Sequence, residues 1–182
     1  MNGDILEILV SEERLRDKAA ELGRAISADY AGRNPLFLGV LKGSFIFMAD
    51  LMRAVTIPCE VDFLAVSSYG RGAENSGSVR ILKDLEYDVA KRHIIIIEDI
   101  LDSGLTLGFL KDILMARNPA SIAICALLDK PARRKADIAP DYTGFVIPDE
   151  FVVGYGLDYA EMYRNLPYIG VLKREIYEKK HK

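Results

Sequence analysis

Three carboxylates follow one short apolar run in this sequence. Residues 93–107 read HIIIIEDILDSGLTL, so four consecutive isoleucines lead directly to Glu98, Asp99 and Asp102. Such a run is typical of a strand buried on both faces in a parallel sheet, and ligands bind at the carboxyl ends of those strands. A single helix cap would explain one acid but not three, so we interpret the cluster as part of a ligand site.

The residues after the acids suit an anion. The segment 103–106, Ser-Gly-Leu-Thr, precedes a helical pattern that begins at Leu107, so it offers free backbone N–H groups at a helix start. The carboxylates could hold sugar hydroxyls or Mg²⁺, which prefers oxygen ligands. A phosphorylated sugar with a metal beside it would use both halves of this loop. The alternative is that Glu98 and Asp99 are surface acids and that Asp102 only caps the helix.

A second loop has the same design. The apolar run 36–41 is followed by Lys42-Gly43-Ser44 and then by a helical pattern through Met52. Lys42 would therefore stand beside another helix start, where it could pair with an anion; it could equally be a solvated loop lysine.

Length and composition limit the possible functions. The chain has 182 residues, half of them hydrophobic, and a formal charge of −3, which fits one domain spanning residues 1–182 and argues against a nucleic-acid or membrane-surface protein. No apolar run reaches membrane-spanning length. Cys59 and Cys125 stand alone in apolar runs, so we expect reduced thiols in a cytoplasmic protein.

The pattern of elements predicts an α/β fold with a central, mostly parallel, twisted sheet flanked by helices. Ser11 opens a helical pattern, and strand-like runs recur at 36–41, 59–66, 79–83, 94–97 and 120–128. The glycine-rich segment 67–78 is either a plain connection or a lid with an aromatic near one hinge.

Three segments carry a resemblance to a known family. Signatures of the type I phosphoribosyltransferases resemble three segments of this chain: EDILDSGLTL, LKGS and FVVGYGLDYAEMYRNLPYIGVL. The carboxylate at Asp102 is similar to the variant found in the hypoxanthine-guanine branch of that family. The resemblance implies a small hood made by the N- and C-terminal segments, with its carboxyl-terminal part at 145–175, and a mobile lid at 67–78. It also implies phosphoribosyl pyrophosphate (PRPP) and a 6-oxopurine as substrates, Mg²⁺ as cofactor and a homodimer or homotetramer.

The resemblance assigns roles to the acid loop. Asp102 would take the purine N7 proton as general base, and Glu98 and Asp99 would hold the ribose hydroxyls and the metal. The 5′-phosphate would sit on the backbone of Ser103, Gly104, Leu105 and Thr106. Leu105 stands where some relatives carry a basic residue, which leaves the backbone cradle intact.

Pyrophosphate would be bound by the second loop and by a distant arginine. The resemblance gives this role to Lys42, Gly43 and Arg164, with a cis peptide bond between Leu41 and Lys42. Ser68 and Tyr69 would belong to the lid that closes over the reacting groups.

The purine side depends on later residues. Lys130 follows an apolar run at the strand end, and a lysine there could donate to the 6-oxo group of a base. The resemblance implies that Phe151 stacks on the purine ring and that the backbone of Val152 binds the purine edge. Leu157 and Asp158 would shape the pocket at position 2 of the purine. Asp158 would also bind the metal. Phe151 could instead be an ordinary core aromatic. For the other charges of the loop 131–135 we expect solvent exposure.

Other functions stay open at this point. The order of preference among hypoxanthine, guanine and xanthine is not fixed by the sequence. A regulator with the same fold would bind PRPP without transferring ribose, but the chain carries Asp102, Asp158 and Arg164 and no basic stripe. Neither a dinucleotide-binding glycine motif nor a P-loop motif is present.

Overall fold

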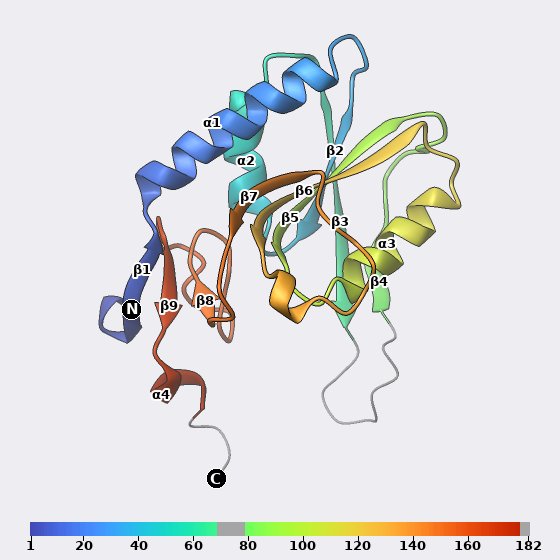
Figure 1. The fold of residues 1–182 in the computed structure, drawn as a ribbon. Helices are drawn as coiled ribbons and strands as arrows, with labels where there is room; N and C mark the ends of the chain where they lie inside the picture. The colour runs from blue at the N-terminus through green and yellow to red at the C-terminus, as the bar shows by residue number, and fades with distance from the viewer. Residues whose placement is uncertain (69–78, 179–182) are drawn as a thin grey trace.

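A six-stranded sheet forms the centre of the computed structural model, which describes residues 1–68 and 79–178 (Figure 1). The strands lie in the order β4 (Val79–Lys83), β3 (Glu60–Ser68), β2 (Leu36–Leu41), β5 (His93–Leu101), β6 (Ser121–Asp129) and β7 (Tyr142–Val146). All neighbours pair in parallel except β3 and β4. The predicted α/β fold with a mostly parallel central sheet is confirmed.

The isoleucine run supplies both faces of the sheet. Ile95 and Ile97 pack into the core below α1 (Glu12–Asp29) and α2 (Phe45–Ala54). Ile94 and Ile96 face the opposite core, which contains the buried leucines of α3 (Leu105–Met115). Successive side chains of a strand point to opposite faces, so one run of isoleucines fills the two layers that the helices cover in Figure 1.

The helix that covers this sheet begins where the sequence predicts. The Ser11 side chain accepts the backbone N–H of Arg14 at 3.4 Å, and Glu12 and Glu13 lie in the first turn of α1. These groups satisfy an unpaired N–H and complement the positive end of the helix. The buried face of α1 includes Leu15 and Ile26.

A smaller antiparallel sheet lies beside the main one. It has the order β1 (Ile5–Val10), β9 (Ile169–Leu172) and β8 (Val152–Val153), so both ends of the chain contribute to it, and we call it the hood. The expected boundary at residue 145 falls inside β7, which belongs to the main sheet. The remaining elements are short: η1 (Asn2–Asp4), η2 (Pro131–Arg133) and α4 (Arg174–Tyr177).

The predicted lid lies largely outside the described residues. Ser67 and Ser68 end β3, whose last residue pairs with Val79 of β4, while Tyr69 and the rest of the segment to residue 78 are among the residues not described. Among the described residues, no helix has both the length and the apolar character needed to cross a membrane.

Candidate active site

The acid loop begins before the end of β5. Glu98 and Asp99 are residues of β5, and the side-chain Oε2 of Glu98 is buried without a hydrogen-bond partner among the described residues. Burial raises the pKa of Glu98 well above its ordinary value, and the charge of Asp99 adds to the rise. A buried acid without a donor is costly, which is expected where a ligand supplies the missing partner.

Asp99 connects the two loops that the sequence singles out. Its Oδ1 accepts the backbone N–H of Ile100 at 2.8 Å. Burial raises the pKa of its carboxyl to about 6, and the N–H of Ile100 opposes that rise. A Cβ built on Gly43 would come within 1.5 Å of Asp99 Oδ2, so only glycine allows the second loop to lie against this carboxylate. The two loops are therefore packed in direct contact.

The second loop has the predicted backbone. The peptide bond between Leu41 and Lys42 is cis, as the resemblance implies. The Lys42 ammonium lies 3.0 Å from Glu161 Oε2, and both side chains are 66 % exposed. Sequence reasoning assigns Glu161 no role, because a single acid in the segment 159–163, with no other acid beside it, carries no signal of its own.

Arg164 lies in the same charged group. Its Nη2 contacts Asp158 Oδ1 at 2.8 Å and Glu161 Oε2 at 3.3 Å, and its Nη1 donates to Gly156 O at 2.7 Å. The structure thus brings the predicted pyrophosphate residues Lys42 and Arg164 to one carboxylate, that of Glu161. An acid that bridges two cations holds the position that an anionic ligand would take.

The segment 103–106, which we call the phosphate-binding loop after its predicted role, turns at Gly104, which has φ +78° and precedes α3. The N–H of Leu105 donates to Ser103 Oγ at 3.4 Å, and the Leu105 side chain is 52 % exposed. The Leu105 side chain therefore points to solvent, which is compatible with the prediction that the backbone N–H groups of this loop, and not its side chains, bind an anion.

Asp102 stands at the front of this loop. Its Oδ1 is buried and makes no aligned hydrogen bond, while Arg133 Nε lies 3.2 Å away as an ion-pair partner. Arg133 also lies 3.6 Å from Asp149 Oδ1. We expected Arg133 to be solvated; its side chain is half-exposed, yet its guanidinium contacts the predicted general base.

The residues that the sequence predicts for purine binding lie around one cavity. Lys130 is 5 % exposed, its ammonium donates to Glu150 O, and burial lowers its pKa although the carboxylates of Asp102 and Asp149 oppose the shift. Phe151 stacks on Tyr177 with ring centroids 4.8 Å apart. Sequence reasoning missed Tyr177, which lies in a charged terminal segment but is ordered in α4.

Two adjoining cavities contain nearly all of these groups. A polar cavity of about 270 Å³ is lined by Lys42, Gly43, Glu98, Ser103, Gly104, Thr106 and Arg164. A second cavity of about 280 Å³ is lined by Lys130, Arg133, Phe151, Val152 and Leu157. Four residues line both cavities, namely Asp99, Ile100, Asp102 and Asp158. Asp102 therefore stands where an occupant of one cavity would meet an occupant of the other.

Arg134 contradicts the expectation of a solvated loop. Its side chain is 15 % exposed and pairs with Asp129, and its guanidinium also donates to the backbone oxygens of Leu101, Asp102 and Ile138. A run of basic residues usually indicates a solvated surface, so nothing in the sequence pattern indicates this burial. Four acceptors satisfy a guanidinium that would otherwise be costly to bury.

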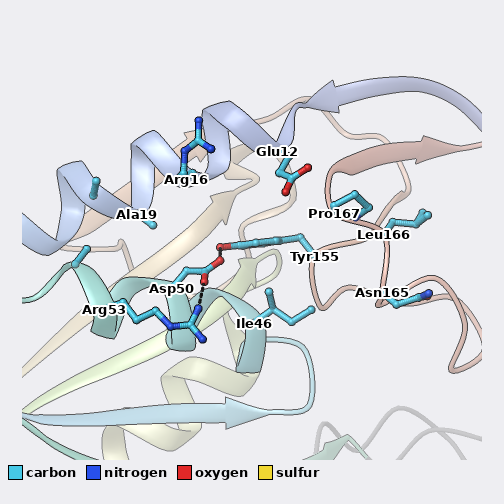
Figure 2. Close-up of a pocket in the computed structure, with 12 residues that line it drawn as sticks. Glu12, Arg16, Ala19, Ile46, Asp50, Arg53, Tyr155, Asn165, Leu166 and Pro167 are labelled. Atoms are coloured by element: carbon cyan, nitrogen blue, oxygen red, sulfur yellow. Dashed lines mark hydrogen bonds and ion pairs between the residues drawn. The ribbon is translucent and has the colours of Figure 1, made fainter.

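A larger cavity of about 580 Å³ lies between α1, α2 and the segment 155–167 (Figure 2). It contains none of the predicted acids. Tyr155 donates its hydroxyl to Asp50 Oδ2 at 2.7 Å, and Arg53 pairs with Asp50 Oδ1 at 2.8 Å. Next to Tyr155, a Cβ built on Gly156 would come within 2.0 Å of Gly43 O. The hydrogen bond of Tyr155 ties the turn 154–157 after β8, which we call the hood turn, to α2, and the close approach of Gly156 packs this turn against the second loop.

The acids suit a magnesium ion that is shared with a ligand. Glu98 Oε2 lacks a partner, and Asp99 and Asp158 line the same polar cavity, so the cavity offers three carboxylates of the kind that Mg²⁺ prefers. Within the described residues, no group of three or more acid, histidine or cysteine side chains forms a ready cage. Mg²⁺ commonly takes one or two carboxylates and completes its shell with phosphate oxygens and water, so the residues fit.

Comparisons with known proteins define the class. The profile described as "Phosphoribosyl transferase domain" matches residues 5–160, and the chain belongs to this family. It is 54 % identical over 178 residues to the hypoxanthine-guanine phosphoribosyltransferase of Bacillus subtilis strain 168, covering 98 % of this chain and 99 % of that protein.

A solved structure and a longer protein are also similar to this chain. The crystal structure of a hypoxanthine phosphoribosyltransferase from Staphylococcus aureus superposes with a TM-score of 0.94 at 49 % identity and covers 97 % of this chain and 96 % of that one. The chain is also 55 % identical over 177 residues to the bifunctional protein TilS/HprT of Listeria monocytogenes serotype 4b, with 97 % of this chain covered. It spans only 27 % of the length of that relative.

Proposed function

We propose that this chain transfers the 5-phosphoribosyl group of PRPP to N9 of hypoxanthine or guanine, which yields IMP or GMP and pyrophosphate. The observation that carries the proposal is the pair of cavities that meet at Asp99, Asp102 and Asp158. One cavity offers backbone N–H groups and cations to phosphates, and the other offers an aromatic face and a buried lysine to a base. Relatives that are similar along the whole chain bear the name of this activity.

The charged half of the site would hold PRPP. The 5′-phosphate would bind the backbone of the segment 103–106 at the start of α3, and Glu98 and Asp99 would accept the ribose hydroxyls. Their carboxylates also lie where positive charge develops on the sugar as the bond to pyrophosphate breaks. Lys42, Gly43 and Arg164 would bind the pyrophosphate, and Ser68 and Tyr69 would belong to the closing lid.

The purine would occupy the second cavity. Phe151 would stack on the ring, Val152 and Leu157 would line its edge, and the Lys130 ammonium would donate to the 6-oxo group. An adenine would present an amino group to that ammonium, so both groups would be donors and adenine would be rejected. The buried Oδ1 of Asp102 makes no aligned hydrogen bond, although Arg133 Nε lies 3.2 Å away, so it could accept the N7–H of the base, and Asp102 would take that proton as N9 attacks.

Magnesium would be held by Asp158 and Asp99, with Glu98 beside them. When bound, it supplies positive charge that stabilises the departing pyrophosphate. The remaining tasks fall to the residues of the chain: they orient the ribose, exclude water and accept the N7 proton.

Location and assembly extend the proposal. Cys59 and Cys125 are free thiols, which supports the cytoplasmic location that we propose for this chain. We also propose a homodimer or homotetramer, with the exposed apolar side chains Leu6 and Ile8 of β1 as the part of the surface to test first. Sedimentation equilibrium would distinguish the two states from a monomer.

The test is release of pyrophosphate from PRPP and Mg²⁺ with hypoxanthine, guanine, xanthine or adenine in parallel. We expect turnover with hypoxanthine or guanine and little with adenine. Asp102→Asn should lower kcat about 10²–10³-fold, because proton transfer in the transition state is lost. Asp112→Asn on the exposed side of α3 is the matched control and should keep activity. Activity with adenine alone would refute the role of Lys130, and PRPP binding without any turnover would indicate a regulator.

A further inference from the structure

Three successive backbone carbonyls behind the phosphate-binding loop are all bound by one short segment. Leu101 O accepts Arg134 Nη2 at 3.3 Å, and Asp102 O accepts Arg134 Nε at 3.0 Å. Ser103 O accepts the backbone N–H groups of Lys135 at 2.9 Å and Ala136 at 3.1 Å. The segment 134–136 therefore determines which way the carbonyls of the loop point.

The opposite side of each peptide unit is the side that would face the ligand. The carbonyl of one residue and the N–H of the next share a planar trans peptide and point in opposite directions. Arg134 binds the carbonyl of Asp102, so the N–H of Ser103 points away from Arg134. The backbone of Lys135 and Ala136 binds the carbonyl of Ser103, so the N–H of Gly104 likewise points away from the segment 134–136. Both residues line the polar cavity.

Arg134 is itself held firmly. Its guanidinium pairs with the carboxylate of Asp129 and donates to Ile138 O, and the two paired side chains are only 15 % and 13 % exposed. Asp129 is the last residue of β6, where it pairs in register with Leu101 of β5. The arginine is therefore anchored to the sheet at the strand end from which the loop departs.

Close packing gives a second, independent contact between the segment and the loop. A Cβ built on Gly104 would come within 2.6 Å of Ile138 Cγ2 and 3.0 Å of Arg134 Cδ. The loop rests on the arginine stem as well as on its guanidinium, so a shorter or thinner side chain would leave the turn unsupported.

We infer that Arg134 is a positioning residue for the phosphate-binding loop: it orients the loop's N–H groups toward the 5′-phosphate without touching the substrate. This inference rests on the proposed function, which places the phosphate on that loop. Lysine cannot replace the arginine, because its single ammonium cannot span acceptors that the planar guanidinium reaches together. Arg134 also lies four residues after Lys130, so one segment supports the phosphate loop and carries the lysine of the purine cavity.

The test compares Arg134→Lys with Arg117→Lys, in which an arginine that pairs with the single carboxylate of Asp84 on the surface undergoes the same change. Steady-state kinetics would be measured against PRPP and hypoxanthine, and binding of ribose 5-phosphate by calorimetry. We expect Arg134→Lys to raise KM for PRPP and the Kd for ribose 5-phosphate at least tenfold, with a less than threefold change in KM for hypoxanthine. Arg117→Lys should change none of these values.

A second variant covers the case in which Arg134→Lys does not fold. Asp129→Asn keeps the shape of the arginine's anchor and removes its charge, so it should raise KM for PRPP about threefold to fivefold. Its thermal midpoint should fall, because the buried guanidinium loses its counter-charge, so the kinetics are measured at a temperature where circular dichroism shows the variant folded. Unchanged KM for PRPP in a folded variant, or equal loss against both substrates, would overturn the positioning role and leave Arg134 a structural residue. Absence of ribose 5-phosphate binding and turnover in the wild type would instead refute the proposed function.

Discussion

The two anion loops start from neighbouring parallel strands, yet they are supported in different ways. The phosphate loop after β5 is backed by Arg134, which is 15 % exposed and bound to four acceptors. The loop after β2 presents Lys42, whose partner Glu161 is as exposed as the lysine itself. In the proposed reaction the 5′-phosphate stays with the nucleotide while pyrophosphate leaves. A rigid cradle suits the group that is retained, and a solvated, exchangeable ion pair suits the group that is released.

The largest effect should come from breaking the rigid loop. Gly104→Ala places a methyl group within 2.6 Å of Ile138 at a φ of +78°, so the turn must change its conformation. We expect kcat/KM for PRPP to fall at least 100-fold. The matched control is Gly108→Ala in α3, where a Cβ would meet Ala136 only at 3.9 Å. It should keep activity and raise stability by up to about 1 kcal/mol, because alanine favours the helix. Equal kinetics in the two variants would remove the distinction between the loops.

A smaller effect should appear at the exposed pair of Lys42 and Glu161, where a substitution should strengthen ligand binding instead of weakening it. Glu161 competes with pyrophosphate for Lys42 and Arg164, so Glu161→Gln should lower the inhibition constant of pyrophosphate about threefold to tenfold. Because the pair is exposed, the difference from wild type should shrink between 50 mM and 500 mM salt. Glu21→Gln, which removes an exposed partner of Lys18 on α1, is the control. Weaker pyrophosphate inhibition in Glu161→Gln would show that the pair supports the loop and is not displaced.

An ion pair outside both loops, between the buried Asp62 and the half-exposed Lys83, tests the same contrast through its pH dependence. Burial alone would raise the pKa of Asp62, but the N–H groups of Glu86 and Phe63 and the ammonium of Lys83 outweigh it and hold the pKa below its ordinary value. A carboxyl with a lowered folded pKa stabilises the fold above its unfolded pKa of about 3.9 and loses that contribution as the pH falls. Asp62→Asn should therefore reduce the free energy of unfolding at pH 7, and the difference from wild type should shrink as the pH falls through the lowered folded pKa, as measured by urea denaturation. Glu161→Gln should show no such loss, and a pH-independent deficit in Asp62→Asn would contradict this account.

The smallest effect concerns the contact between the hood and α2. Tyr155→Phe removes one hydrogen bond to Asp50, which should cost about 1 kcal/mol of stability. KM for PRPP should change by less than threefold, because the hood turn remains packed on Gly43. Tyr87→Phe, at a side chain that is 76 % exposed, should be neutral. A tenfold rise in KM for PRPP in Tyr155→Phe would mean that the hood positions the second loop.

The sequence predicts much of this site because its strongest signals are local. The run Ile94–Ile97 defines a doubly buried strand, and Glu98, Asp99 and Asp102 follow it at the end where parallel strands place ligands. The supporting groups are different, since they act across the fold. Arg134 and Arg133 look like an ordinary basic loop, and only the pairing of β5 with β6 brings them to Leu101 and Asp102. Glu161 and Tyr177 gain their roles from neighbours that are distant in sequence.

The hood brings the two ends of the chain together. β1 pairs with β9 along its length, the N–H of Lys173 donates to Asp4 O at 2.9 Å, and its ammonium donates to Gly3 O at 2.7 Å. β8, which is bonded to β9, supplies Val152 to the purine cavity. In topological terms the described chain is nearly a closed ring, and its closure completes the wall of the cavity that we propose for the purine. A circular permutant that joins residues 1 and 178 through a short linker should therefore fold, and trimming β1 should impair purine binding before it affects the phosphate loop.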